Sequence, residues 1–363
     1  MLSFFRWVLF FLVLFATVLG GAVFVGHTLL VAEGPLDKTK NIVIPRGAGP
    51  VTMARVLHEQ DVISHPQLFR VALLVDATPK VIKAGEYEVP AHISMKALVD
   101  LLQSGKVVQR RFTVTEGMTT SEILDLLRKT EALSGEITVN VREGDLLPET
   151  YFYSRDDTRD GVLLRMKEAL DKTLDEAWRK RVAGLPLANR REALILASII
   201  EKETAVAAER PRVAAVYINR LRRRMKLESD PTTAYGLTDG KAALGRELTR
   251  ADLQSNSPYN TYIVPALPPG PICNPGRASI VAAVNPAPRD RSIYFVADGQ
   301  GGHAFAASLY EHNRNVARWR DIQRQRQDPQ PASAPSGSAP SPPAPSTPTP
   351  STPAPSAPAP ARP

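Results

Sequence analysis

The chain has 363 residues, which is long enough for two folded units. Its hydrophobic content of 43% is ordinary for soluble domains. Its 45 basic and 37 acidic residues give a net charge of +8, which could suit binding to nucleic acid. The sequence contains no recognised nucleic-acid-binding motif, so we expect no nucleic-acid partner. The single cysteine, Cys273, excludes an intramolecular disulfide and a cysteine-rich zinc site.

A long apolar segment opens the chain. No charged residue lies between Arg6 and His27, and the intervening residues would span about 30 Å as a helix, which is the thickness of a bilayer core. We therefore predict a transmembrane helix over residues 7–26, with residues 1–6 in the cytoplasm and the rest of the chain across the membrane. A cleaved signal peptide is the alternative, but the apolar run is longer than usual for one and no convincing cleavage site follows.

The pattern of residues 39–115 predicts a small mixed module of strands and helices. In chain order we expect a strand, two helices, a strand, a helix and a strand, at residues 41–45, 50–60, 66–77, 84–89, 94–103 and 107–114. Ser94 is expected to cap the third helix. The strand–helix–helix–strand order is similar to that of LysM modules, which bind N-acetylglucosamine polymers; a plain structural module is the alternative.

Residues 116–327 are expected to form a second, mixed α+β domain. We predict helices at residues 120–129, 161–182, 209–225, 279–284 and 308–325, and a hairpin of strands at 292–297 and 303–305. The segment Pro148–Tyr151 is predicted to turn and to place an acidic and an aromatic side chain close together. Residues 328–363 are mainly Pro, Ala, Ser and Thr, which cannot bury enough apolar surface to offset the entropy of ordering, so we predict a disordered tail.

A buried helix within residues 191–209 is predicted at the centre of this domain. The side chains from Ala193 to Ile200 are almost all apolar, so the helix would be hydrophobic on all sides. Glu201 and Glu203 then follow, and Glu203 lies three residues after Ile200 on the same face. Desolvation at the end of a buried helix raises the pKa of a carboxylate and suits it to act as a general acid. A solvated helix end is the alternative interpretation of these charges.

Three segments after this helix are rich in Pro, Gly, Asn, Thr and Tyr, and we predict them as loops: residues 227–236, 257–262 and 267–276. This composition fixes turns and presents hydroxyls, amides and aromatic rings, which are common in saccharide sites. A rigid scaffold would have a similar composition, so the loops alone leave both interpretations open.

The order of several motifs resembles that of the YceG-like family, the endolytic murein transglycosylases of bacterial inner membranes. After the apolar N-terminal segment they read LASIIEKETA (196–205), SDPTTAYG (229–236), SPYNTY (257–262), LPPGPICNPG (267–276) and YFVADGQGGHAF (294–305), followed by His312 and Asn313. The resemblance covers most of residues 39–324 and leaves out the tail.

The resemblance implies lytic cleavage of the β-1,4 bond between N-acetylmuramic acid and N-acetylglucosamine in nascent peptidoglycan, giving 1,6-anhydro-muramoyl ends and ending glycan elongation. Enzymes with this activity typically use one glutamate, often followed by Ser or Thr at a helix end, and Glu203-Thr204 matches that pattern. They need no metal or cofactor. The implied partners are peptidoglycan glycan strands and glycan polymerases, and the implied location of the catalytic domain is the periplasmic side of the inner membrane.

Glu203 is, by the same resemblance, the expected catalytic acid and base, and Glu201 is its competitor because it also ends the helix. The candidate supporting or substrate-binding residues are Glu201, Thr204, Asp230, Thr232, Tyr235, Tyr259, Asn260 and Asn274. Each of these could instead stabilise a turn. Two other functions remain open, a non-catalytic peptidoglycan-binding scaffold and a true hydrolase that uses the same cleft.

Overall fold

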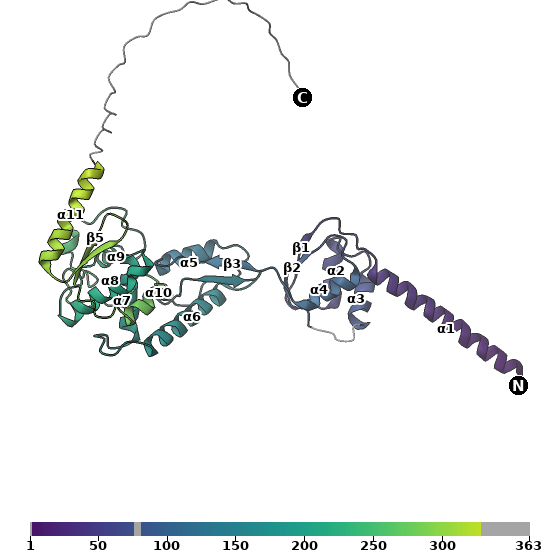
Figure 1. Ribbon diagram of the computed structural model, residues 1–363. Helices are drawn as coiled ribbons and strands as arrows, with labels where there is room; N and C mark the ends of the chain where they lie inside the picture. Colours follow the sequence, from purple (N-terminus) through teal and green to yellow (C-terminus); the bar gives the residue numbers. More distant parts are fainter. Residues whose placement is uncertain (1, 76–80, 328–363) are drawn as a thin grey trace, which may run out of the picture.

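The computed structural model describes residues 2–75 and 81–327, so the expected tail at residues 328–363 lies outside the described residues. Figure 1 shows a long helix, α1 (Leu2–Val31), a small unit at its C-terminal end and a larger unit beyond that. Residues Phe4–Val31 are long and apolar enough to cross a membrane, with a mean hydropathy of 2.8 and no burial of the most apolar stretch. The predicted span over residues 7–26 lies within this helix.

The small unit is built on a two-stranded antiparallel sheet in which Ile42 lies opposite Tyr87. Its elements are β1 (Lys40–Ile44), α2 (Pro50–Glu59), α3 (Pro66–Val75), β2 (Gly85–Val89) and α4 (Met95–Ser104). This order confirms the predicted one, although the last two residues of the helix predicted at 66–77 lie outside the described residues. Ser94 caps α4 as predicted, because its Oγ accepts a hydrogen bond from the Ala97 amide at 3.3 Å.

The larger unit begins with a second antiparallel pair, β3 (Arg110–Thr113) and β4 (Thr150–Tyr153). Of the strand predicted at 107–114, residues 110–113 therefore pair within the larger unit. Val107 instead packs on the core of the small unit, and the Val108 amide donates to the Glu86 carbonyl of β2 at 2.6 Å. Tyr151 lies in β4 opposite Phe112, so the prediction of a turn over Pro148–Tyr151 is wrong at its C-terminal end. The reason is alternation: Tyr151 and Tyr153 both contribute to the core beneath the strand pair, whereas Phe152 between them is exposed.

One carboxylate joins the two units. Glu86 of β2 is only 5% exposed and forms ion pairs with Arg110 at 2.8 Å and Arg155 at 3.1 Å, both of which belong to the larger unit. The hydrogen bonds and charges of these arginines lower the pKa of Glu86, although burial opposes them. A further hydrogen bond crosses the same junction, from Arg46 Nη2 to the carbonyl of Asp156 at 2.7 Å.

The core of the larger unit surrounds helix α7 (Arg190–Glu203). The other elements are α5 (Thr120–Lys129), α6 (Arg159–Arg179), α8 (Arg210–Arg222), α9 (Asp230–Thr238), α10 (Arg277–Val284), β5 (Tyr294–Ala297), β6 (His303–Ala306) and α11 (Leu309–Gln327). Helices α6, α8 and α10 pack against α7, whose residues from Ala193 to Ile200 are all buried. The predicted buried helix is confirmed, and so are the α+β class, the helix at 120–129 and the β5–β6 hairpin.

Helix α9 differs from the prediction of a loop over residues 227–236. Its sequence contains Pro231 and Gly236, which usually mark turns, but Pro231 occupies the first turn of the helix, where no backbone N–H is required. Asp239 then ends the helix in the left-handed conformation, with φ 53°. The segment is therefore a short helix that presents its side chains beside the end of α7.

Candidate active site

The last residue of α7 is Glu203, and Thr204 already has an extended backbone with φ −142° and ψ 129°. Asn189 fixes the opposite end, because its side chain accepts a hydrogen bond from the Glu192 amide at 3.1 Å. Between these ends the helix is held by the core on all sides. The position of Glu203 is therefore set by a packed helix rather than by a flexible loop.

The carboxyl group of Glu203 is held through one of its two oxygens. Oε1 accepts hydrogen bonds from the Tyr217 hydroxyl at 2.7 Å and from Ser229 Oγ at 2.5 Å. Within residues 2–75 and 81–327, Oε2 has no hydrogen-bond partner. When Glu203 is neutral, its proton therefore lies on Oε2, since Oε1 already receives two donors.

The surroundings of Glu203 favour that neutral form. Burial raises the pKa of Glu203 above its ordinary value of 4.5, and the charge of Asp230 raises it as well. The hydrogen bonds from Ser229 and Tyr217 and the charge of His303 act in the opposite direction without cancelling the effect of burial. A carboxyl group with a raised pKa keeps its proton at higher pH and can deliver it to a substrate.

Tyr217 remains a hydrogen-bond donor because it cannot easily lose its proton. Its side chain is 1% exposed and meets the ring of Phe295 edge to face, with centroids 6.0 Å apart. Burial and the charge of Glu203 both raise the pKa of Tyr217 well above 10.0. Tyr217 and Ser229 were not among the residues predicted for the site, and Ser229 lies in the motif directly before Asp230.

Glu201, the competitor for the catalytic role, is turned toward a different set of groups. Its side chain is 5% exposed, with Oε1 paired to Arg210 at 3.1 Å and Oε2 accepting the Gly276 amide at 2.8 Å. Arg210 also pairs with Glu116 at 3.2 Å. Glu201 therefore ties α7 to the start of α8 and to the loop before α10, and both of its oxygens are occupied.

A second acid and a histidine lie next to Glu203 along the chain. Thr204 is buried, and its Oγ1 donates to Glu209 Oε2 at 3.4 Å. The same Oε2 is 2.7 Å from His303 Nδ1, and Glu209 Oε1 accepts the His303 amide at 2.8 Å. This pair holds the β5–β6 hairpin beside the end of α7. The sequence prediction missed it because the two residues are 94 positions apart.

Three of the predicted residues have polar atoms at or near the surface of the site. The hydroxyl of Tyr262 donates to Asp230 Oδ1 at 2.6 Å, which orients that carboxylate at the start of α9. Tyr235 and Tyr259 contact each other, with ring centroids 4.8 Å apart. The hydroxyl of Tyr235 also donates to Glu143 at 3.4 Å, so this aromatic pair joins α9 to the segment before β4.

The remaining three predicted residues are fully buried and hold loops together. Thr232 Oγ1 donates to the Ser229 carbonyl at 2.7 Å. The Asn260 side chain donates to two carbonyls of the segment before it, at 3.0 and 2.9 Å. Asn274 accepts the Leu146 amide at 3.0 Å and donates to the carbonyl of Met118 at 3.1 Å. Their polar groups support the positions of neighbouring segments and have no exposed surface in this structure.

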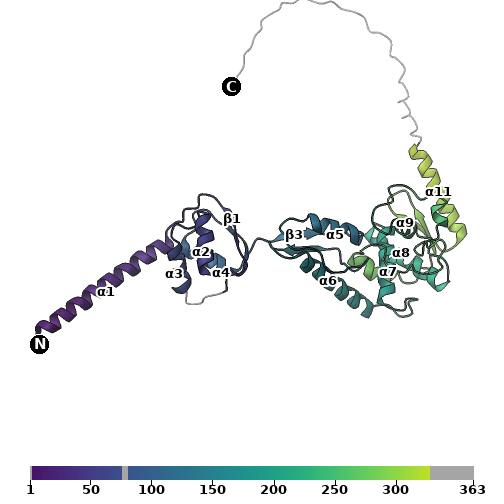
Figure 2. The same ribbon diagram turned by 180° about the vertical axis from the view of Figure 1, so that it is seen from behind.

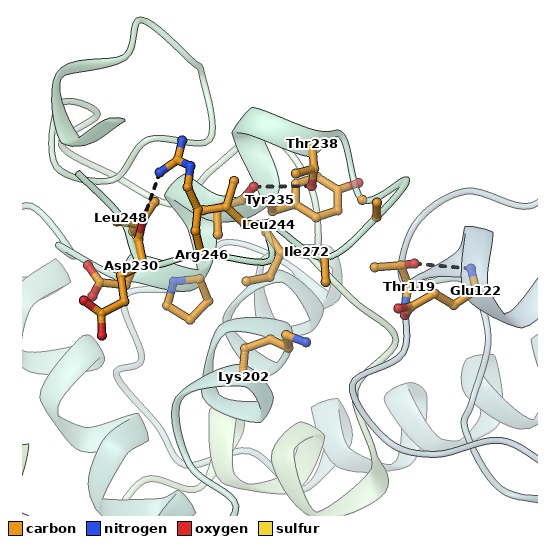
Figure 3. A pocket seen from close by; sticks show the side chains of 16 residues that line it. Thr119, Glu122, Lys202, Asp230, Tyr235, Thr238, Leu244, Arg246, Leu248 and Ile272 are labelled. Carbon is orange, nitrogen blue, oxygen red and sulfur yellow. Dashed lines mark hydrogen bonds between the residues drawn. The ribbon is translucent and has the colours of Figure 1, made fainter. Parts of the chain in front are cut away.

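A pocket of about 600 Å³ opens beside these groups, between α9, the start of α5 and the end of α7. Figure 3 shows four of its polar side chains arranged around the hollow: Lys202, Asp230, Tyr235 and Arg246. Glu203 itself does not line this pocket, but Lys202 directly precedes it in the chain, and Asp230, whose charge acts on Glu203, is one of the lining residues. Among the described residues, no group of three or more His, Cys, Asp or Glu side chains could hold a metal ion.

The family model described as YceG-like matches residues 42–318, which include Glu203, both of its hydrogen-bond donors and the Glu209–His303 pair. The chain belongs to the YceG-like family. The family segment thus takes in the small unit and almost all of the larger one, but it begins after α1.

The chain is also similar to individual members of the YceG-like family. It is 29% identical over 335 residues to a Bacillus subtilis (strain 168) protein named endolytic murein transglycosylase, covering 82% of this chain and 89% of that protein. A protein of the same name from Streptococcus pneumoniae D39 is 28% identical over 85% of this chain. The match covers 64% of that protein, so this chain spans less than two thirds of its length. A crystal structure of a yceG-like protein from Listeria monocytogenes aligns at 27% identity over 77% of this chain and 99% of that one, with a TM-score of 0.47.

Proposed function

We propose that this protein is a membrane-anchored lytic transglycosylase with Glu203 as its single catalytic acid and base. The observation that carries the proposal is the asymmetric carboxyl group of Glu203, held by two hydroxyl donors through Oε1 and unpartnered at Oε2. Membership of the YceG-like family and the name of its relatives, endolytic murein transglycosylase, supply the reaction class.

The proposed reaction needs only one carboxyl group. Protonated Oε2 of Glu203 donates its proton to the glycosidic oxygen between N-acetylmuramic acid and N-acetylglucosamine as the bond to C1 breaks. The resulting carboxylate then takes the proton from the C6 hydroxyl of the muramic acid, and O6 forms a bond to C1. The product is a 1,6-anhydro end, no water is consumed, and Glu203 returns to its protonated form. Because the attack is intramolecular, little entropy is lost in it.

Tyr217 and Ser229 would stabilise Glu203 in the middle of this cycle. Both donate to Oε1 and strengthen their bonds when the carboxyl group becomes negative. Asp230 is close enough to Glu203 for its charge to act on that carboxyl group, and a muramic acid bound beside the two carboxylates would have its oxocarbenium character stabilised by them. The pocket of about 600 Å³ would hold part of the strand, with Lys202 available to a carboxylate of the peptide stem.

The chain outside the site supports a location beside new peptidoglycan. We propose that α1 anchors the protein in the inner membrane, with the larger unit on the periplasmic side, as its composition predicts. The β–α–α–β order of the small unit supports a LysM-like role in binding glycan. An enzyme tethered in this way would cut nascent strands beside glycan polymerases and so end their elongation.

Incubation of the full chain in detergent with uncrosslinked glycan strands, followed by mass spectrometry, tests the chemistry. We expect 1,6-anhydro ends from the wild type and from Glu201→Gln, and none from Glu203→Gln. Reducing ends would indicate a hydrolase, and binding without cleavage would indicate a scaffold. Full activity of Glu203→Gln together with loss of activity in Glu201→Gln would contradict the assignment of the acid.

Removal of residues 1–31 tests the tether separately. We expect the shortened chain to remain active on soluble strands and to cut fewer strands in cells, because it no longer stays near the membrane where strands emerge. Unchanged cutting in cells, measured by the glycan length distribution at matched protein levels, would refute the tethering.

A further inference from the structure

Helix α3 exposes an apolar face. Val71, Leu74 and Val75 are 50%, 84% and 72% exposed, and their spacing places them on one side of the helix. The opposite side carries Phe69, which is fully buried in the core of the small unit. A surface helix normally directs polar side chains to water, so this face is suited to an apolar environment.

The apolar face lies where α1 joins the small unit. Leu29 of α1 and Ala32 just after it line a pocket together with Leu68 of α3 and His65 just before it, so the end of α1 and the start of α3 are neighbours. Figures 1 and 2 both show α3 beside the C-terminal end of α1 and on the side of the small unit away from the larger one. The exposed apolar face of α3 therefore lies on the same end of the small unit as the exposed apolar helix α1.

We propose that α3 lies on the membrane surface with Val71, Leu74 and Val75 among the lipid chains, next to the point where α1 leaves the bilayer. The partner is the phospholipid bilayer itself. Arg70 is exposed on the same helix, and its long side chain can reach the phosphate groups while the apolar residues are submerged. The inference rests on the proposed function in one respect, namely that α1 spans the membrane.

A bilayer fits this face better than the other candidate partners do. Glycan strands are polar and would leave three exposed apolar side chains unsatisfied. A second copy of the chain would require its own α3 to approach beside its own membrane helix, whereas lipid is already present at the end of α1. Two contacts with the membrane, α1 and α3, would hold the small unit in one orientation. The Glu86 junction would then pass that orientation to the larger unit.

Fluorophores attached to single introduced cysteines test the lipid contact in the full chain. The native Cys273 is fully buried, so labelling is directed to the introduced position. We would label Leu74→Cys in α3, Val18→Cys in α1 and Leu164→Cys in α6, which are all exposed apolar positions. The protein would be placed in nanodiscs that hold one copy each, with quenchers attached to the lipid acyl chains.

We expect quenching at positions 18 and 74 and none at position 164. Quenching at 18 but not at 74 would overturn the proposal for α3 and leave the anchor intact. An absence of quenching at both positions would refute the anchor and the α3 contact together. Protection of position 74 only in discs that hold two copies would overturn the proposal in favour of a contact between copies.

A charged variant provides the second measurement. In the Leu74→Cys background, Val71→Glu with Val75→Glu should abolish quenching at position 74, because carboxylates are costly to insert among lipid chains. Both residues are exposed, so the fold should persist, and a circular dichroism spectrum checks this. Leu164→Glu is the matched control and should leave quenching at position 74 unchanged. Quenching that survives the two added charges would overturn the proposal.

Discussion

The active site and the junction between the two units each contain a shielded glutamate, and the two behave in opposite ways. Glu86 at the junction is paired with Arg110 and Arg155, and its pKa is lowered. Glu203 in the site is held by the hydroxyls of Tyr217 and Ser229, and its pKa is raised. Burial acts in the same direction on both carboxyl groups. The charge of the partners therefore decides whether a shielded carboxyl group is a permanent anion or a proton donor.

The opposite pKa shifts of Glu86 and Glu203 suit their different roles, an ion pair between units and a general acid. An ion pair between units needs a charge that does not change with pH, and two arginines provide it. A general acid needs a proton that it can give and take back, and neutral hydroxyl donors stabilise its charged form without making that form permanent. Exchanging each glutamate for the neutral Gln, which has nearly the same shape, separates these roles.

The largest expected effect is on the rate of cleavage by Glu203→Gln. An amide cannot donate an acidic proton, so we expect turnover of uncrosslinked strands to fall by about 10²- to 10⁴-fold, the usual contribution of general acid–base catalysis. Release of anhydro products over time measures it. Glu86→Gln serves as the control and should keep its rate on short soluble strands, because it lies outside the site. A similar loss in both variants would show that the rate reports folding rather than chemistry.

The next effect is on the stability of Glu86→Gln. Removal of the charge leaves Arg110 and Arg155 without their partner, and breaking a buried pair costs about 3 to 5 kcal/mol; because the arginines are 29% and 40% exposed, we expect about 3 kcal/mol or less. The lowered pKa of Glu86 gives stability that is present above pH 4.5 and is lost as the pH falls through the lower folded-state value. Denaturant unfolding at pH 7 and pH 3 should therefore show a difference that shrinks in acid. A constant difference would contradict the ion-pair explanation.

A smaller effect is expected from Ser229→Ala on the pH profile of cleavage. The hydrogen bond from Ser229 lowers the pKa of Glu203, so its loss should raise that pKa and move the alkaline limb of the activity profile to higher pH. The net contribution of a hydrogen bond to a charged group is about 1.5 to 3 kcal/mol, which bounds the change. Thr233→Ala, four residues further along in α9, removes a hydroxyl that donates to Asn260 instead, and it should leave the alkaline limb of the activity profile unchanged. A shift to lower pH in Ser229→Ala would contradict the assignment.

The smallest effect is on the stability of Glu203→Gln. Because the pKa of Glu203 is raised in the folded state, its ionisation destabilises the fold as the pH rises above 4.5 through the folded-state value. Gln avoids this cost and keeps an oxygen for Tyr217 and Ser229. We expect the variant to melt at the same temperature as the wild type near pH 4 and slightly higher at pH 8. Lower stability at pH 8 would show that Glu203 is held as an anion.

Local patterns were sufficient to predict most helices and the position of Glu203. The apolar run from Ala193 to Ile200 indicates a buried helix, and the helical repeat then places Glu203 at its end. The hydroxyl groups that hold it were not predictable in this way, because Tyr217 and Ser229 lie 14 and 26 residues away and reach it only through the packing of α8 and α9. Long-range packing determines which side chains surround a group, and no local pattern encodes that.

The misassigned segments have a similar cause. Residues 230–238 contain Pro, Gly and Thr, which favour turns, yet they form α9 because the buried Thr232 and Thr233 pack inside the fold. Likewise, the composition of Pro148–Tyr151 favours a turn, but pairing with β3 draws residues 150–153 into a strand. Tertiary contacts outweighed the local propensities in both places.

The burial of Cys273 has a consequence for measuring motion. Its thiol lies against the carbonyl of Ser198 on α7 at 3.4 Å, inside the segment that forms one wall of the site. Burial raises the pKa of this thiol well above 9.0, so it reacts with a disulfide reagent only when the segment opens. The rate at which this thiol is modified therefore reports how often the segment around Cys273 opens. A bound glycan that holds the segment in place would lower that rate.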